Sequence, residues 1–255
     1  MHNTVLITGA SSGIGKELAY LYAKDAKQLI LVARNESRLK EVAEEVEKHG
    51  AKATIISQDL AEPQSAQLLL EKIKDQAKDI EVLINNAGFG DIGDFSNADI
   101  DKTENMMQLN MNTLTSLTRL IVPHMINNNK GAIMNVASTA AFQPGPYMAV
   151  YFATKAYVLS LSEALQAELE DKGVHVMALC PGPTDTHFAE TANDGKNLSF
   201  FKNTMDAKTV AKLAKEGMEK KKAIVITGTK NRLTTLLPKL LPRSVVRKVM
   251  KGVLK

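Results

Sequence analysis

The sequence predicts one α/β domain: a doubly wound parallel sheet of about seven strands with helices on both faces. Short β-branched apolar runs alternate with longer segments of helical periodicity from residue 4 to residue 227. The short runs are apolar throughout, as expected for strands that are covered on both faces. A glycine-rich turn, TGASSGIG, separates the first run from the first helical segment.

Each predicted strand is a short apolar run, and helical segments fill the gaps between strands. The strands are Thr4–Thr8, Leu29–Ala33, Ala53–Ser57, Val82–Asn85, Ala132–Ser138, Val174–Cys180 and Ala223–Thr227. The helices are Gly13–Lys24, Glu36–His49, Pro63–Lys78, Ile100–Asn127, Val150–Lys172 and Ala207–Lys220. In such sheets ligands bind beyond the carboxyl ends of the strands, so we expect the chemistry at that edge.

Composition agrees with a single globular domain over residues 1–229. Of the 255 residues, 44% are hydrophobic and 24% are charged, and no Pro/Gly/Ser-rich linker divides the chain. The single cysteine, Cys180, excludes an internal disulfide and is predicted to be a small buried hydrophobe. The N-terminus lacks the basic start and long apolar core of a signal peptide, so a cytoplasmic location is expected. No His/Cys/acid cluster suggests a metal site, so no metal is expected.

Residues 230–255 form a basic, amphipathic extension with its own charge balance. The net charge of the chain is +4, and this extension holds eight basic residues and no acid, so residues 1–229 carry −4. The body is therefore not predicted to bind nucleic acid. Apolar residues recur at helical spacing along the extension, and Pro238 and Pro242 interrupt it. Such a stripe can pack on the body, on a partner subunit or on a membrane surface.

The glycine-rich turn predicts a dinucleotide site in a Rossmann-like fold. Glycine permits positive φ and a close backbone approach, and the following helix start offers unpaired N–H groups to a pyrophosphate. The spacing is Gly-x-x-x-Gly-x-Gly, and a ligand-free turn is the alternative interpretation. The candidate cofactor-binding residues here are Gly9, Ser11, Ser12, Gly13, Ile14 and Gly15.

The end of the second predicted strand favours NADP over NAD. An NAD site usually places an acid there for the ribose, whereas this strand ends in Ala33 followed by Arg34. Arg34 can pair with a 2′-phosphate unopposed by a carboxylate, and Arg38 lies one helical turn on. A solvated surface charge is the alternative for Arg34. After the third strand, Asp59 and Leu60 are expected near an adenine, and Asp59 is alternatively a helix N-cap.

Several motifs together resemble the short-chain dehydrogenase/reductase family. They are TGASSGIG, NNAG at Asn85–Gly88, Asn110, Ser138, Tyr151-x-x-x-Lys155 and PGPTDT at Pro181–Thr186. The resemblance extends from about Thr4 to about Thr227, and residues from Lys230 onward depart from common members. The combination is specific, although no single motif is.

The resemblance implies a catalytic set whose chemistry is physically reasonable. Tyr151 and Lys155 lie one helical turn apart, and a nearby positive charge lowers the pKa of a phenol. Ser138 can hydrogen-bond a substrate oxygen as charge develops on it. By resemblance, Tyr151 exchanges the proton, Lys155 also holds the nicotinamide ribose, and Asn110 lies behind Lys155 in a water-linked proton path. Taken singly, these residues could instead form an amphipathic helix edge, a loop cap and an exposed polar site.

The resemblance also suggests further contacts to cofactor and substrate. The cofactor is expected to lie against the backbone of Asn86, Ala87 and Gly88. The candidates near the nicotinamide are Pro181, Gly182, Thr184 and Thr186. Residues 187–205 form an irregular segment that is either a lid or a surface loop. An apolar substrate pocket is expected from Phe89, Phe142, Tyr147, Met148 and Phe188.

The predicted function is NADP-dependent hydride transfer between the nicotinamide and a carbonyl or secondary alcohol of a small molecule, with reduction of a ketone or aldehyde favoured. The alternatives are a non-catalytic NADP-binding regulator and a 3-oxoacyl reductase of fatty-acid metabolism. Family members often pair the Ile100–Asn127 and Val150–Lys172 helices across a subunit interface, which implies a homodimer or homotetramer.

Overall fold

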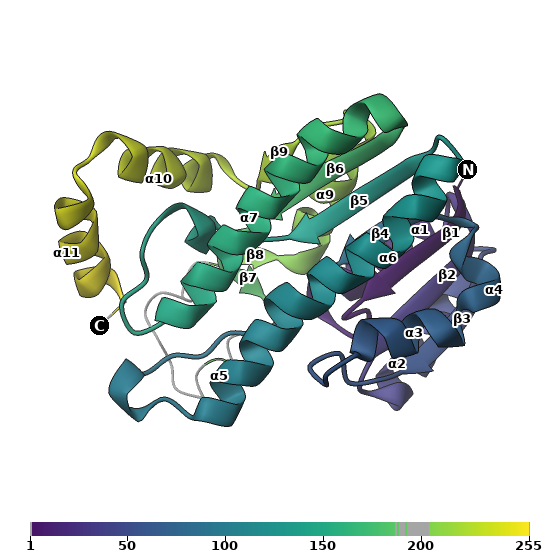
Figure 1. Ribbon diagram of the computed structural model, residues 1–255, viewed down its shortest axis with the longest axis horizontal. Helices are drawn as coiled ribbons and strands as arrows, with labels where there is room; N and C mark the ends of the chain where they lie inside the picture. The colour runs from purple at the N-terminus through teal and green to yellow at the C-terminus, as the bar shows by residue number, and fades with distance from the viewer. Residues whose placement is uncertain (1, 187, 189–191, 193–203, 255) are drawn as a thin grey trace.

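All seven predicted strands pair in one parallel sheet of order β3-β2-β1-β4-β5-β6-β9 (Figure 1). This computed structural model describes residues 2–186, 188, 192 and 204–254. The α/β fold class predicted from the sequence is therefore confirmed. The strands are β1 His2–Thr8, β2 Ala26–Ala33, β3 Lys52–Ser57, β4 Ile80–Asn85, β5 Gly131–Val136, β6 Val174–Cys180 and β9 Ile224–Ile226.

Helices connect these strands close to the predicted positions. They are α1 Gly13–Tyr22, α2 Glu36–Lys48, α3 Ser65–Lys72, α4 Lys74–Ala77, α5 Ile100–Met107, α6 Leu114–Asn127, α7 Ala149–Leu169, α9 Ala207–Glu219, α10 Thr229–Leu240 and α11 Arg243–Val253. Short turns are η1 Phe95–Asn97, η3 Thr139–Phe142 and η4 Glu170–Lys172, and β7 Thr184–Asp185 pairs with β8 Met205–Asp206. The strand order reverses between β1 and β4, which creates the ligand crevice typical of such sheets.

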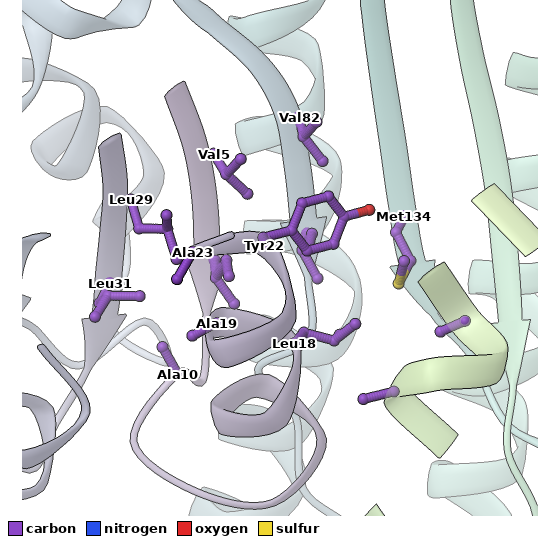
Figure 2. Packing of buried hydrophobic residues seen from close by; sticks show 14 of the residues in the cluster. Val5, Ala10, Leu18, Ala19, Tyr22, Ala23, Leu29, Leu31, Val82 and Met134 are labelled. Atoms are coloured by element: carbon purple, nitrogen blue, oxygen red, sulfur yellow. The ribbon is translucent and has the colours of Figure 1, made fainter. Parts of the chain in front are cut away.

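Two apolar layers sandwich the sheet because alternate strand residues face opposite sides. Val5 and Ile7 of β1 face the layer formed with α1, α2 and α9, and Leu6 between them faces the layer of α3 and α6. Figure 2 shows the first layer, in which the Tyr22 ring of α1 lies among strand side chains. Cys180 is fully buried in a smaller cluster, as predicted.

A buried polar chain ties the helices that carry the candidate site to the strands beneath them. The Asn85 Nδ2 group donates to Thr118 Oγ1 at 2.9 Å and to Asn135 Oδ1 at 2.8 Å. The Asn135 Nδ2 group donates in turn to Ser162 Oγ at 3.0 Å. Because each buried amide is satisfied, these bonds fix α6 and α7 in register with β4 and β5.

Two long predicted helices are interrupted. The helix expected over Pro63–Lys78 begins at Ser65, because Gln64 has a positive φ of 58°, and it is divided at Ile73 into α3 and α4. The helix expected over Ile100–Asn127 contains a π-helical segment, η2 Gln108–Thr113, between α5 and α6. π-helical turns inside α-helices are frequent at functional sites, and η2 contains the predicted site residue Asn110.

The C-terminal extension forms two helices that meet at Pro242. The two prolines are expected to break or kink the run: Pro238 lies inside α10 and does not break it, whereas Pro242 directly precedes α11, where the run is broken. Val246, Met250 and Leu254 of α11 pack in a cluster with Met106 of α5. One face of α11 therefore packs on the body. In the described part of the chain, no helix combines the length and apolar character needed to cross a bilayer.

Candidate active site

A cavity of about 450 Å³ opens along the carboxyl edge of the sheet. The glycine turn, the ends of β2 to β6 and the start of α7 contribute to it. Most of the predicted site residues line it together: Gly9, Ser11, Ser12, Gly13, Ile14, Arg34, Arg38, Asp59, Leu60, Asn86, Ala87, Gly88, Phe89, Ser138, Met148, Tyr151, Lys155, Pro181, Gly182, Thr184, Thr186 and Phe188. The volume lies within the range of small-ligand pockets.

Four predicted residues do not line this cavity. Gly15 and Asn110 act from behind its wall, as described below. The substrate expectations for Phe142 and Tyr147 are not supported, because Phe142 packs on the cluster around Cys180 and Tyr147 faces a small neighbouring pocket. Tyr147 has a positive φ of 65°, and its carbonyl accepts a bond from Gly93 N, which turns the residue away from the main cavity.

The cavity also has walls that the sequence analysis did not single out as site residues. Most of them directly follow strand ends or neighbour a predicted residue, so strand position was a usable signal for them. Leu109 and Gln143 line the cavity although their predicted neighbours Asn110 and Phe142 do not. The additional lining residues are Ala33, Asn35, Gln58, Leu109, Val136, Ala137, Thr139, Ala140, Gln143, Phe152 and Pro183.

The glycine turn points the first turn of α1 into the cavity. Gly9 and Gly13 have positive φ values of 65° and 53°, which side chains disfavour. The Ser12 side chain makes no capping hydrogen bond, and the first N–H groups of a helix lack partners within it. A Cβ on Gly13 would lie 2.8 Å from Thr186 Cγ2, so helix and loop approach closely there. This cradle fits the pyrophosphate of a dinucleotide.

Hydrogen bonds from the NNAG segment hold the turn in place. Thr8 Oγ1 accepts bonds from the N–H groups of Asn86 and Ala87, each at 3.0 Å. The Asn86 Nδ2 group donates to the carbonyls of Thr8 and Gly9 at 3.0 and 3.1 Å. The backbone and the side chain of Asn86 therefore anchor the glycine turn, and Asn86, Ala87 and Gly88 line the cavity, where their contact with a cofactor stays a prediction.

The expectation that no carboxylate opposes Arg34 is wrong. Asp59 Oδ2 lies 3.7 Å from Arg34 Nη1, and the Arg34 side chain is 74% exposed. Arg34 and Asp59 follow the ends of β2 and β3, which pair side by side, and spacing along the chain does not show this neighbourhood. Asp59 Oδ1 accepts from Ala61 N rather than capping a helix. This pair, with Arg38, lines one side of the cavity.

Tyr151 and Lys155 are buried side by side at the start of α7. Lys155 Nζ lies 5.8 Å from the centre of the Tyr151 ring and donates to Val136 O at 2.8 Å. Burial raises the pKa of Tyr151 to about 12, and a hydrogen bond with Ser138 partly offsets it. Burial also lowers the pKa of Lys155 to about 8. Desolvation, offset only by the Ser138 hydrogen bond, sets the pKa of Tyr151, so the expected lowering by Lys155 is not found.

Ser138 lies two residues beyond the end of β5, at the same edge. Its Oγ accepts a bond from Ala140 N at 3.1 Å, so it caps η3 as well as facing Tyr151. The capping role that the sequence left open is therefore real, and it coexists with the cavity position. The Ser138 hydroxyl also donates to Pro181 O at 3.5 Å, and the residue lines the cavity.

Asn110 braces the wall behind Lys155 from the π-helical segment. Its Oδ1 accepts from Phe89 N at 3.2 Å, and its Nδ2 donates to Phe89 O at 2.9 Å and to Thr154 Oγ1 at 3.1 Å. A Cβ on Gly88 would lie 2.9 Å from Asn110 Oδ1 and 3.4 Å from Lys155 Nζ. Asn110 and Lys155 therefore flank Gly88, and Asn110 is buried rather than on an exposed face.

Aromatic side chains surround the phenol of Tyr151. Its ring centre lies 5.2 Å from that of Phe188 and 6.1 Å from that of Phe152. Met148 belongs to the same cluster. An apolar wall beside a proton-bearing hydroxyl suits a carbonyl on an apolar molecule. Among the described residues, no group of three or more His, Cys, Asp or Glu side chains is placed to hold a metal. His187, Phe200 and Phe201 of the expected lid lie outside the described residues.

Comparisons with known proteins agree with this geometry. A family model described as short chain dehydrogenase matches residues 3–197. The ketoacyl reductase HetN of Nostoc is 34% identical over 179 residues, which are 70% of this chain and 62% of that protein. This chain thus spans less than two thirds of the length of HetN.

Two further proteins match over nearly their whole length. The NADP-dependent 3-hydroxy acid dehydrogenase of Schizosaccharomyces pombe is 33% identical over 235 residues, 89% of this chain and 90% of that protein. The structure of a short-chain dehydrogenase from Sphingobium yanoikuyae in complex with NADPH is 32% identical, covers 93% of both chains and has a TM-score of 0.84.

Proposed function

We propose a reaction for this chain from the premise that it belongs to the short-chain dehydrogenase/reductase family and is therefore an oxidoreductase. The reaction is NADP-dependent hydride transfer between the nicotinamide and a carbonyl or secondary alcohol, with reduction of an apolar ketone or aldehyde as the favoured direction. One observation carries the proposal: the glycine-turn helix and the Ser138, Tyr151 and Lys155 side chains line a single cavity.

In this mechanism NADPH, when bound, supplies the hydride that reaches the carbonyl carbon. Tyr151 donates its phenolic proton to the carbonyl oxygen, and the products are the alcohol and the oxidised cofactor. A pKa of about 12 keeps that proton on Tyr151 at neutral pH, which suits the role of acid. Ser138 orients the carbonyl oxygen, and Lys155 contributes its positive charge beside the phenol. Asn110 is a positioning residue for the wall at Phe89.

Arg34 and Arg38 support the choice of NADP. They line the cavity close to the ends of β2 and β3, and two relatives that match over most of their length are named for NADP or NADPH. Asp59 orients the Arg34 guanidinium from 3.7 Å and leaves most of it exposed to a 2′-phosphate. No acid stands at Ala33, where an NAD ribose would be bound.

The Arg34→Ala variant tests this cofactor choice. Loss of a charge-assisted contact to the 2′-phosphate is expected to raise the KM for NADPH about 10- to 100-fold. The KM for NADH is expected to stay within about twofold, since NADH lacks that phosphate. Arg119→Ala, on the exposed side of α6, is the matched control and should change neither KM. Equal efficiency of the unmodified protein with NADH and NADPH would contradict the proposal.

The pH dependence of reduction reports on Lys155. Its pKa of about 8 means that the ammonium is charged below that pH and neutral above it. We expect the turnover number for reduction to be level through neutral pH and to fall as the pH rises past about 8. In Lys155→Arg, which keeps the charge, the remaining activity should show no such fall. A level profile into the alkaline range in the unmodified protein would refute this role.

A carbonyl and alcohol panel with both cofactors tests the reaction itself. A 3-oxoacyl thioester belongs on the panel, since HetN is named a ketoacyl reductase and the fission-yeast relative a 3-hydroxy acid dehydrogenase. Turnover of that compound alone would favour the 3-oxoacyl reductase. Tight NADPH binding without turnover of any panel member would favour a non-catalytic regulator.

The proposed assembly is a cytoplasmic homodimer or homotetramer. Tyr157 of α7 is 39% exposed and its hydroxyl lies 2.8 Å from Thr115 Oγ1 of α6. This contact joins the outer faces of α6 and α7 into one surface, which supports the pairing of these helices across a subunit interface.

A further inference from the structure

Helices α10 and α11, with the short link between them, carry most of the exposed large apolar side chains in the described part of the chain. Among the described residues, twelve large apolar side chains are exposed, and eight of them lie between residues 233 and 253. A concentration of this kind marks an interaction surface rather than chance exposure. We define the docking face by these eight residues: Leu233, Leu236, Leu237, Leu240, Leu241, Val245, Val249 and Val253.

The helical spacing places these residues on continuous faces. In α10, Leu233, Leu236 and Leu240 share one side and are 62%, 53% and 80% exposed, whereas Thr235 on the other side is buried. In α11, Val245, Val249 and Val253 recur every four residues and are exposed. The adjoining row, Val246, Met250 and Leu254, packs on the body. One side of each helix is therefore buried, and another side exposes apolar residues to solvent.

The same segment is strongly basic. Residues 230–255 hold eight Lys and Arg residues and no acid. Arg243, Arg247, Lys248 and Lys251 of α11 are exposed, and none forms an ion pair with a described residue. The positive charge is therefore available to an external partner. Figure 1 shows α10 and α11, in yellow, on the side of the molecule away from β2 and β3.

We propose that the docking face binds the surface of an anionic lipid membrane. An exposed apolar face flanked by Lys and Arg has the two properties that interfacial helices use, burial among acyl chains and attraction to acidic headgroups. A second copy of the chain is the poorer occupant, because pairing two such faces would bring sixteen basic residues together with no acid within either segment.

The position of α11 links this face to the cavity. Its buried row belongs to the same apolar cluster as Met148, Tyr151 and Phe152, which line the cavity. One apolar cluster therefore contains both the buried row of α11 and the side chains around Tyr151. A membrane-bound molecule would hold the side chains around Tyr151 on the side that faces the lipid, which suits an apolar substrate. The suitability for an apolar substrate rests on the proposed function, whereas membrane binding itself does not.

Co-sedimentation of the full chain with vesicles tests the proposal. We expect binding to equimolar phosphatidylcholine–phosphatidylglycerol vesicles and at least about tenfold weaker binding to pure phosphatidylcholine, because each basic residue near an anionic surface contributes about fivefold. High salt should weaken the binding to the mixed vesicles. Equal binding to both vesicle types, or none to the anionic ones, would overturn the proposal.

Three variants of the full chain separate the contributions of apolar area and of positive charge to vesicle binding. The Leu236→Ser/Leu240→Ser variant removes apolar area, and Arg247→Gln/Lys248→Gln/Lys251→Gln removes charge; each should weaken anionic-vesicle binding at least about tenfold. Leu68→Ser on α3, which is 48% exposed, is the control and should bind like the unmodified chain. Unchanged thermal unfolding midpoints establish that the variants are folded.

Light scattering without lipid tests whether a second copy of the chain, rather than a membrane, covers the docking face. The proposal expects the subunit number to be the same in the unmodified chain and in Leu236→Ser/Leu240→Ser. If that variant instead lowers the subunit number and vesicle binding is absent, the face is a subunit interface and the membrane proposal fails. Vesicle binding that is unaffected by both variants would overturn it as well.

Discussion

Replacing Tyr151 with phenylalanine is expected to lower the turnover number for carbonyl reduction by about 10³-fold or more, because the proton donor is removed. The ring remains, so its packing with Phe152 and Phe188 is kept. Tyr151 is one of many residues that line the cavity, and NADPH affinity should therefore change little. The measurement is steady-state NADPH oxidation with a ketone substrate, together with fluorescence titration of NADPH binding.

Tyr157→Phe is the control, since it makes the same chemical change two turns further along α7. Tyr157 is 39% exposed and its hydroxyl contacts Thr115 rather than the cavity. Its turnover number should match that of the unmodified chain. Full activity of Tyr151→Phe would refute the proposed mechanism, whereas loss of NADPH binding in that variant would show that its defect is structural.

Replacing Gly15 with alanine is expected to damage both stability and cofactor binding. A Cβ there would overlap the Gly9 carbonyl oxygen and Asn86 Nδ2, which belong to the glycine turn and its support. Alanine normally favours a helix by about 1 kcal/mol, but this overlap with backbone should reverse the sign. We expect a net loss of about 2 kcal/mol or more in the free energy of unfolding, typical of overpacking. Urea denaturation and NADPH titration measure the two effects.

Gly93→Ala is the matched control for this substitution. Nothing lies within 4 Å of a Cβ at Gly93, and its φ is not in the left-handed region. Its stability should change by less than about 0.5 kcal/mol, as for an ordinary surface substitution. A Gly15→Ala variant as stable as Gly93→Ala, with normal NADPH binding, would show that the turn tolerates a side chain.

The sheet could be predicted because its signal is local. Each strand is a continuous apolar run, and the observed bounds of β6 equal the predicted Val174–Cys180. The glycine turn, the NNAG segment and the Tyr151/Lys155 pair follow strand ends or open a helix. A parallel sheet gathers such positions at one edge, so the sequence could also predict that they line one cavity.

The predictions that failed depend on contacts between distant segments. Asp59 faces Arg34 because β2 and β3 are neighbours, which spacing along the chain does not reveal. The pKa of Tyr151 depends on how completely the folded chain removes water from the phenol, and this burial raises the pKa instead of lowering it as expected from the neighbouring lysine. The π-helical segment around Asn110 has no distinctive composition. It accompanies contacts such as the hydrogen bond from Asn110 to Thr154, which form only in the folded chain.

The packing of α11 also has a consequence for the order of biosynthesis. Chains leave the ribosome N-terminus first, and domains begin to fold as they emerge. Residues 243–254 emerge after every strand of the sheet, yet Val246, Met250 and Leu254 complete the cluster that contains Tyr151. The nascent chain can thus assemble its nucleotide-binding edge before the wall behind its reactive phenol is finished. The Tyr151 side chain therefore reaches its final packing only after residues 243–254 have left the ribosome.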